Sequence, residues 1–175
     1  MIKVLFVIPK NKSWFGNKGV TGFPHVGIAY LTAVLKKNKI PVKIFDEGIE
    51  KESGKLMVLI DEFKPNIIGI TSFSYGYGFL EETIKRLKRN TNIPIIIGGP
   101  HVAATGDEII RVTPADFALV GEGEVSFLEF LKQQEEKRPD FKKVPGLIWK
   151  KGKKIFKGML GSQKESQKLI LRITK

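Results

Sequence analysis

The segment IIIGGPHVAAT (residues 95–105) decides the fold class, because three isoleucines run directly into two glycines, a proline and a histidine. A short apolar run closed by glycine and proline is typical of a buried strand that ends in a loop. We therefore expect a strand over residues 93–98. Two successive glycines leave space beside the end of this strand, which predicts that a bulky group approaches the backbone there.

The same pattern recurs on both sides of this segment. Further strands are predicted over residues 2–8, 41–46, 66–72 and 116–120, and helices over residues 26–38, 55–63, 79–90, 107–112 and 122–133. Apolar strands that alternate with helices indicate a parallel sheet covered on both faces. The predicted fold class is therefore α/β: a doubly wound, Rossmann-like or flavodoxin-like sheet of five parallel strands, with a small C-terminal β-hairpin around Lys151 and Gly152.

The chain divides into three segments by composition. We expect an α/β domain over residues 1–134, a linker and hairpin over 135–157, and an unassigned basic tail over 158–175. The net charge of +12 belongs to the C-terminal part, because residues 1–131 hold 16 Lys and Arg against 14 Asp and Glu, whereas residues 132–175 hold 14 against 4. This distribution predicts a solvated basic surface, and we expect no nucleic-acid partner.

Composition also excludes several classes of site. The chain has no cysteine, which rules out disulfides, thiolate zinc sites, cysteine nucleophiles and iron–sulfur ligation by its own residues. It shows neither a signal peptide nor an apolar run of the ~20 residues that a membrane span needs. We expect a cytoplasmic protein that does not enter membranes.

Candidate binding residues follow the predicted strands, because ligands of open parallel sheets bind outside the carboxyl ends of the strands. These residues are Thr71, Ser72, Phe73 and Ser74; Gly98, Gly99, Pro100 and His101; and Gly121, Glu122, Gly123 and Glu124. Most are glycines or hydroxyl-bearing residues, which suit close approach of a large ligand and hydrogen bonding to it. No dinucleotide fingerprint, Walker motif or receiver-type acid cluster accompanies them, so the pattern favours a binding module and assigns no catalytic residue.

Five motifs occur in order along residues 1–157: PHVGIAYLTAVLKKNKIPVKIFD, KPNIIGITSFS, IPIIIGGPH, ADFALVGEGEVSFLEFL and VPGLIWKKGKKI. Together they resemble the amino-terminal cobalamin-binding domain of cobalamin-dependent radical S-adenosylmethionine (SAM) enzymes. The resemblance implies cobalamin as the cofactor, with its nucleotide tail in the cleft at the strand ends and its corrin ring over the carboxyl edge of the sheet. It adds Pro24, His25, Val26 and Gly27, at the start of the first helix, to the expected cofactor-binding residues.

The sequence lacks two motifs that related cobalamin-dependent proteins carry, and each absence changes which residues are expected to bind metal. Methyl-transferring cobalamin domains carry DxHxxG before the first helix, and here Gly22 and Pro24 occupy the aspartate and histidine positions, with His25 one place away. No metal ligand is therefore assigned, although His101 is expected beside the cofactor. The radical enzymes also bind their cluster through CxxxCxxC, which a chain without cysteine cannot do.

We therefore expect no catalysis and no iron–sulfur cluster in this chain alone. It is interpreted as a part or truncated form of a cobalamin-dependent radical SAM methyltransferase or cyclase, or as a module that serves a separate radical SAM catalytic subunit. The alternative is a non-catalytic nucleotide-binding or regulatory module that uses the same cleft.

Overall fold

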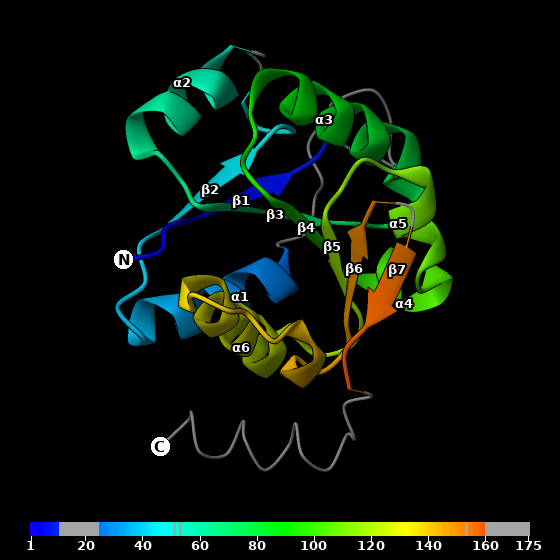
Figure 1. The fold of residues 1–175 in the computed structure, drawn as a ribbon. Helices are drawn as coiled ribbons and strands as arrows, with labels where there is room; N and C mark the ends of the chain where they lie inside the picture. Colours follow the sequence, from blue (N-terminus) through cyan, green and yellow to red (C-terminus); the bar gives the residue numbers. More distant parts are fainter. Residues whose placement is uncertain (11–24, 51, 53, 153, 160–175) are drawn as a thin grey trace.

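Within the described residues, one sheet of seven strands organises the fold (Figure 1). The computed structural model describes residues 1–10, 25–50, 52, 54–152 and 154–159. The strand order is β2-β1-β3-β4-β5-β6-β7, and β1 to β5 are parallel. The strands are β1 (Val4–Ile8), β2 (Val42–Asp46), β3 (Ile67–Thr71), β4 (Ile95–Gly98), β5 (Phe117–Leu119), β6 (Leu147–Lys151) and β7 (Lys154–Lys157).

Helices cover both faces of this sheet. They are α1 (Val26–Lys37), α2 (Lys55–Phe63), α3 (Tyr77–Asn90), α4 (Pro100–Thr105), α5 (Glu108–Val112) and α6 (Gly123–Glu135), with short 3₁₀ turns at Ser74–Gly76 and Phe141–Lys143. The helices α1 and α6 pack on one face and α2 to α5 on the other, as Figure 1 shows. Among the described residues, no helix is long and apolar enough to cross a membrane.

The predicted doubly wound α/β class is confirmed, and the hairpin forms where the sequence predicts it. Its strands do not stand apart from the sheet, however: β6 pairs antiparallel with β5 and β7 with β6, which extends five strands to seven. The structure also contains a helix, α4, where the sequence analysis expected a loop. Pro100 occupies its first turn, a position that proline favours because its missing N–H would be unsatisfied there anyway.

Side chains alternate between the two faces along each strand, which produces two separate cores. On β1, Val4, Phe6 and Ile8 pack toward α1 and α6, whereas Leu5 and Val7 pack toward α2 to α5. All five residues are buried. This alternation fixes which residue of each strand can reach a site on a given face.

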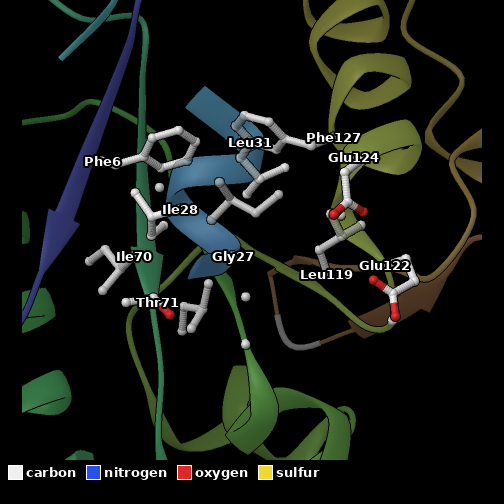
Figure 2. A pocket seen from close by; sticks show the side chains of 17 residues that line it. Phe6, Gly27, Ile28, Leu31, Ile70, Thr71, Leu119, Glu122, Glu124 and Phe127 are labelled. Carbon is white, nitrogen blue, oxygen red and sulfur yellow. The ribbon is translucent and has the colours of Figure 1, made fainter. Parts of the chain in front are cut away.

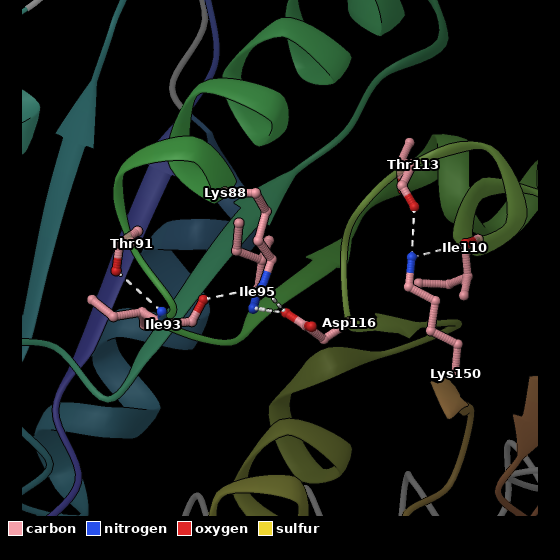
Figure 3. A network of polar contacts seen from close by, with 8 residues as sticks. All are labelled: Lys88, Thr91, Ile93, Ile95, Ile110, Thr113, Asp116 and Lys150. Carbon is pink, nitrogen blue, oxygen red and sulfur yellow. Dashed lines mark hydrogen bonds and ion pairs between the residues drawn. The ribbon is translucent and has the colours of Figure 1, made fainter. Parts of the chain in front are cut away.

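Charged side chains attach α3 to the sheet from its middle and from its C-terminal turn. Near the carboxyl edge of the sheet, the buried Glu47 accepts a 2.8 Å hydrogen bond from the Thr83 hydroxyl and forms an ion pair with Arg86. At the opposite edge, Lys88 Nζ lies 2.5 Å from Asp116 Oδ2, which also accepts a 2.7 Å hydrogen bond from the backbone N–H of Ile95 (Figure 3). These contacts attach α3 to the ends of β2, β4 and β5.

A second contact in Figure 3 fastens the hairpin to α5. Lys150 Nζ, on β6, donates to the carbonyl oxygen of Thr113 at 2.8 Å, just past the C-terminus of α5. Partial burial lowers the pKa of this ammonium group from its ordinary value. The lysine therefore serves as a cap for α5.

Candidate functional site

A cavity of about 170 Å³ lies on the α1/α6 face of the sheet, at the carboxyl ends of β3, β4 and β5 (Figure 2). We call it the sheet-edge pocket. Its floor comes from the strands and its walls from the first turns of α1 and α6. It lies where open parallel sheets place their ligands.

Large residues and glycines are neighbours across the strands that form the floor of the pocket. Phe6, Gly69 and Ile96 are neighbours across β1, β3 and β4, and Thr71 and Gly98 are neighbours one step closer to the edge. Gly69 is required by packing, because a Cβ there would lie 2.7 Å from the Phe6 ring. The glycine therefore lets the Phe6 ring lie across β3.

Gly98 and Gly99 serve different purposes, although both line the pocket. A Cβ on Gly98 would have nothing within 4 Å, so this glycine leaves open space. Gly99 has a φ of +107°, and a Cβ there would lie 2.7 Å from the Ser72 carbonyl oxygen. Gly99 is thus required by the backbone and by the close approach of β3, whereas protein packing does not require Gly98.

The two walls meet at the start of α6. On α1, Gly27, Ile28 and Leu31 face the pocket, and Gly27 would also have nothing within 4 Å of an added Cβ. On α6, a Cβ on Gly123 would lie 3.3 Å from Leu31, so this glycine allows the two helices to approach each other. Phe127 adds an aromatic ring that lies 5.6 Å from the ring of Phe6.

Two carboxylates occupy the α6 side of an otherwise mostly apolar lining. Glu122 is the N-cap of α6 and is exposed, and its side chain makes no capping hydrogen bond. Glu124 lies in the first turn, and its Oε2 is buried without a hydrogen-bond partner in the part of the chain that the structure describes. Figure 2 shows both carboxylates across the pocket from Ile70 and Thr71.

Eight of the expected binding residues lie at the pocket: Gly27, Thr71, Gly98, Gly99, Gly121, Glu122, Gly123 and Glu124. His25, Phe73 and Thr71 line a smaller hollow nearby, on the side of β1. Ser72 is buried, and its hydroxyl donates a 2.8 Å hydrogen bond to the Gly98 carbonyl oxygen, so it supports the strand end. Val26 and Pro100 are not among the pocket residues, and Pro24 lies outside the described residues.

Ser74 and His101 form a separate polar contact at the same edge of the sheet. The Ser74 hydroxyl lies 3.1 Å from His101 Nδ1, and the His101 ring packs on Tyr77 with their centroids 5.1 Å apart. Neither residue lines the sheet-edge pocket. Among the described residues, no group of three or more His, Asp or Glu is placed to hold a metal ion.

The apolar lining of the pocket is absent from the residues predicted from sequence. Phe6, Ile28, Leu31, Leu119 and Phe127 read as ordinary core residues, because periodicity shows that a residue points inward and not whether the space beyond it is filled. One signal was available: Gly69 interrupts the buried strand IIGIT, and a glycine inside a strand often marks a close approach.

Comparison with known protein families and relatives agrees with this architecture. Residues 18–131 match the family described as the B12 binding domain. An uncharacterized methyltransferase, PH0819, of Pyrococcus horikoshii is 30% identical over 159 residues, which cover 89% of this chain and 34% of the relative. The cobalamin-dependent radical SAM methyltransferase TokK of Streptomyces tokunonensis is 28% identical over 97 residues, 54% of this chain and 14% of the relative.

Solved structures of radical SAM enzymes share the fold. The methyltransferase TsrM of Kitasatospora setae, with cobalamin and a [4Fe-4S] cluster bound, has a TM-score of 0.77 at 19% identity, over 92% of this chain and 30% of TsrM. The enzyme OxsB, with aqua-cobalamin and S-adenosylmethionine bound, has a TM-score of 0.68 at 14% identity, over 92% of this chain and 22% of OxsB. This chain thus spans about a third or less of the proteins it matches.

Proposed function

The chain belongs to the B12-binding domain family, and we propose that it holds cobalamin by inserting the nucleotide tail of the cofactor into the sheet-edge pocket. The observation that carries this proposal is Gly98, which lies at the end of β4 and lines the cavity, and where an added Cβ would meet no atom of the described residues within 4 Å. Space kept open by a residue without a side chain is what a buried ligand requires.

The size of the pocket supports a partial insertion. Pockets that bury a whole drug-sized ligand usually measure about 300–1,000 Å³, whereas this cavity measures about 170 Å³. It suits one flat end of a large ligand, such as the base of a nucleotide tail. The remainder of the cofactor would then lie outside, over the carboxyl edge of the sheet.

The walls of the pocket would hold the tail by apolar contact and by leaving space for it. Phe6, Ile28, Leu31 and Phe127 offer apolar surface for a flat base, and Gly27 leaves room at the start of α1. The residues Thr71 and Gly98 lie side by side at the mouth. When bound, cobalamin supplies a cobalt centre that can carry an alkyl group.

A visible-absorbance titration with hydroxocobalamin, followed by desalting, tests the proposal. The wild-type protein should retain about one equivalent of colour. Gly98→Leu should lose it, because the new side chain enters the pocket without meeting protein atoms at its Cβ. The matched control is Gly78→Leu, since Gly78 is exposed on α3, on the opposite face, and also has open space around it.

Thermal melting of both variants separates blocked binding from misfolding. A Gly98→Leu variant that melts like the wild type and retains no colour supports the pocket as the cofactor site. Equal retention by Gly98→Leu and the wild type would place the cofactor elsewhere. No retention by the folded wild-type protein would remove cobalamin as the ligand and favour a smaller nucleotide.

We further infer that the bound cofactor serves methyl transfer by a radical SAM catalytic unit. The support is the similarity to TokK, a cobalamin-dependent radical SAM methyltransferase, and to PH0819, an uncharacterized methyltransferase. Metal analysis of the protein isolated from its native cells, with whatever segments accompany it, tests this inference. One [4Fe-4S] cluster and one cobalamin, as in TsrM, would give four iron atoms per cobalt; cobalt without iron would contradict it.

A further inference from the structure

Glu124 presents a polar atom that the described part of the protein leaves without a partner. Its Oε2 is buried, and the residue lines the sheet-edge pocket (Figure 2). Most buried polar groups in proteins have a hydrogen-bond partner, because an unpaired one loses its hydration without compensation. An unpaired carboxylate oxygen beside a cavity therefore indicates that a donor is supplied by what occupies the cavity.

The start of α6 does not by itself account for this side chain. A helix N-terminus favours a negative charge, which suits a carboxylate beside Gly123. That electrostatic effect still leaves Oε2 without a donor among the described residues. The neighbouring Glu122 is different, because it is exposed and water can satisfy it. The nearby walls contribute Leu31 and Phe127, which cannot donate a hydrogen bond.

We propose that Glu124 accepts a hydrogen bond from the nucleotide tail of the bound corrinoid and thereby makes the pocket selective for corrinoids that carry this tail. The inference rests on the proposed cofactor site and goes further, because it names the residue that discriminates between ligands and the chemistry by which it does so. Sites built to hydrogen-bond a ligand reject analogues that lack the donor, since the buried acceptor is then left unpaired.

A nucleotide tail can offer Glu124 two kinds of hydrogen-bond donor. One is a hydroxyl of the ribose, which cobalamin carries. The other is an amino group on the base, which an adenine-containing corrinoid carries and the dimethylbenzimidazole of cobalamin lacks. Cobinamide, the corrinoid without any nucleotide, offers neither donor at this position. These three ligands therefore separate the two sources from each other and from any contact to the corrin ring.

The experiment measures the dissociation constants of the three corrinoids for the wild-type protein, Glu124→Met and Glu124→Gln. Glu124→Met keeps the approximate size of the side chain and removes the acceptor. We expect cobalamin to bind about ten- to a hundredfold more weakly to this variant, which is the usual worth of a hydrogen bond to a charged group. Cobinamide should change by less than about twofold, because it makes no contact that the variant removes.

Two further variants make the result specific to the Glu124 acceptor. Glu124→Gln should recover part of the affinity, because its amide oxygen can still accept. Glu129→Gln removes one negative charge from the same helix at a residue that already accepts from Gln133 outside the pocket, and should bind all three corrinoids like the wild type. Without ligand, Glu124→Met should stay folded with little change in melting temperature, because removing a buried oxygen that has no described partner offsets the loss of a favourable charge at the start of α6.

The pattern across the ligands decides the outcome. Weakening with cobalamin and with the adenine analogue identifies a ribose hydroxyl as the donor, and weakening with the adenine analogue alone identifies the base; both support the proposal. Equal affinities of Glu124→Met and the wild type for both cobalamin and the adenine analogue would overturn it, as would equal weakening of cobinamide. If the wild type retains no corrinoid, the proposed function fails first, and this inference fails with it.

Discussion

The helices α3 and α1 lie on opposite faces of the same sheet, and they differ in what is placed beneath them. The first is attached by charged pairs from its middle and its C-terminal turn, to Glu47 near one edge of the sheet and to Asp116 near the other. The second presents Gly27, Ile28 and Leu31 to a cavity. Charged pairs therefore hold α3 against the sheet, whereas α1 borders the sheet-edge pocket, so stability and binding should respond to different substitutions.

The sharpest test of these charged pairs is Glu47→Ala. The substitution leaves the Arg86 guanidinium and the Thr83 hydroxyl without their partner, and removing one member of a buried pair usually costs about 3–5 kcal/mol. Because Arg86 is partly exposed, we expect a loss near the lower end, about 3 kcal/mol of unfolding free energy in urea. Retention of hydroxocobalamin at low temperature should persist.

An exposed carboxylate supplies the control for this variant. Glu52, whose side chain is 74% exposed, forms a 3.6 Å ion pair with Lys55. Its replacement by alanine should cost less than about 1 kcal/mol, as exposed pairs usually do. If Glu47→Ala were as mild as Glu52→Ala, the charged pair would not brace α3.

The adjacent Gly98 and Gly99 test the difference between stability and binding at neighbouring positions. Gly99→Ala should cost about 2–3 kcal/mol, because alanine at a φ of +107° is strained and its Cβ meets the Ser72 carbonyl oxygen. Gly98→Ala should change stability by less than about 0.5 kcal/mol and should weaken corrinoid retention. Urea denaturation and the desalting assay measure the two effects. Equal destabilisation by both variants would show that Gly98 is a packing residue too.

Asp116→Ala tests the brace at the other edge. The variant removes the acceptor for Lys88 and for the backbone N–H of Ile95, and we expect a loss of about 2 kcal/mol, typical of hydrogen bonds to a charged group. Hydrogen exchange at Ile95 should accelerate more than at Val7, which is buried in β1 between β2 and β3. Unchanged exchange at Ile95 would show that the carboxylate does not fix the start of β4.

The smallest change in stability is expected from substitution of Asp107, which precedes α5. Hydrogen bonds from Lys157 and from Arg111 lower the pKa of this carboxyl group to about 2, from an ordinary value of 3.8. Because the folded-state pKa is the lower one, the contribution to stability is present above pH 3.8 and is lost as the pH falls toward 2. Asp107→Asn should therefore be slightly less stable than the wild type at pH 6, and the difference should disappear near pH 2. A difference that stays constant over this range would contradict the assignment.

The order of elements could be predicted from sequence because each strand and helix carries its own local pattern. The apolar runs at residues 4–8, 67–71 and 95–98 specify buried parallel strands, and the periodic residues of α1 and α3 specify their helices. The union of the hairpin with the sheet could not be seen in this way. It depends on which edge is left open for β6, and that is a property of the assembled sheet.

The residues at the edge of the candidate site could be predicted from the sequence, whereas the features of its interior could not. Gly98 and Glu124 stand at strand and helix ends that topology brings together, so their proximity follows from the fold class. The distinction between Gly98 and Gly99 depends on a φ angle and on the position of the Ser72 carbonyl, and neither is encoded in the residue types. The unpaired oxygen of Glu124 likewise became visible only with the packing around it.

The strand order has a consequence for the timing of synthesis. A nascent chain that has emerged as far as Gly98 already contains β1 to β4, but it lacks Leu119, Phe127 and the wall formed by α6. Since a domain generally folds as a unit, the sheet and its pocket should form together, after these later residues have been made. Competence to capture a ligand therefore arrives late, and a ribosome-bound chain gains it only after α6 has emerged.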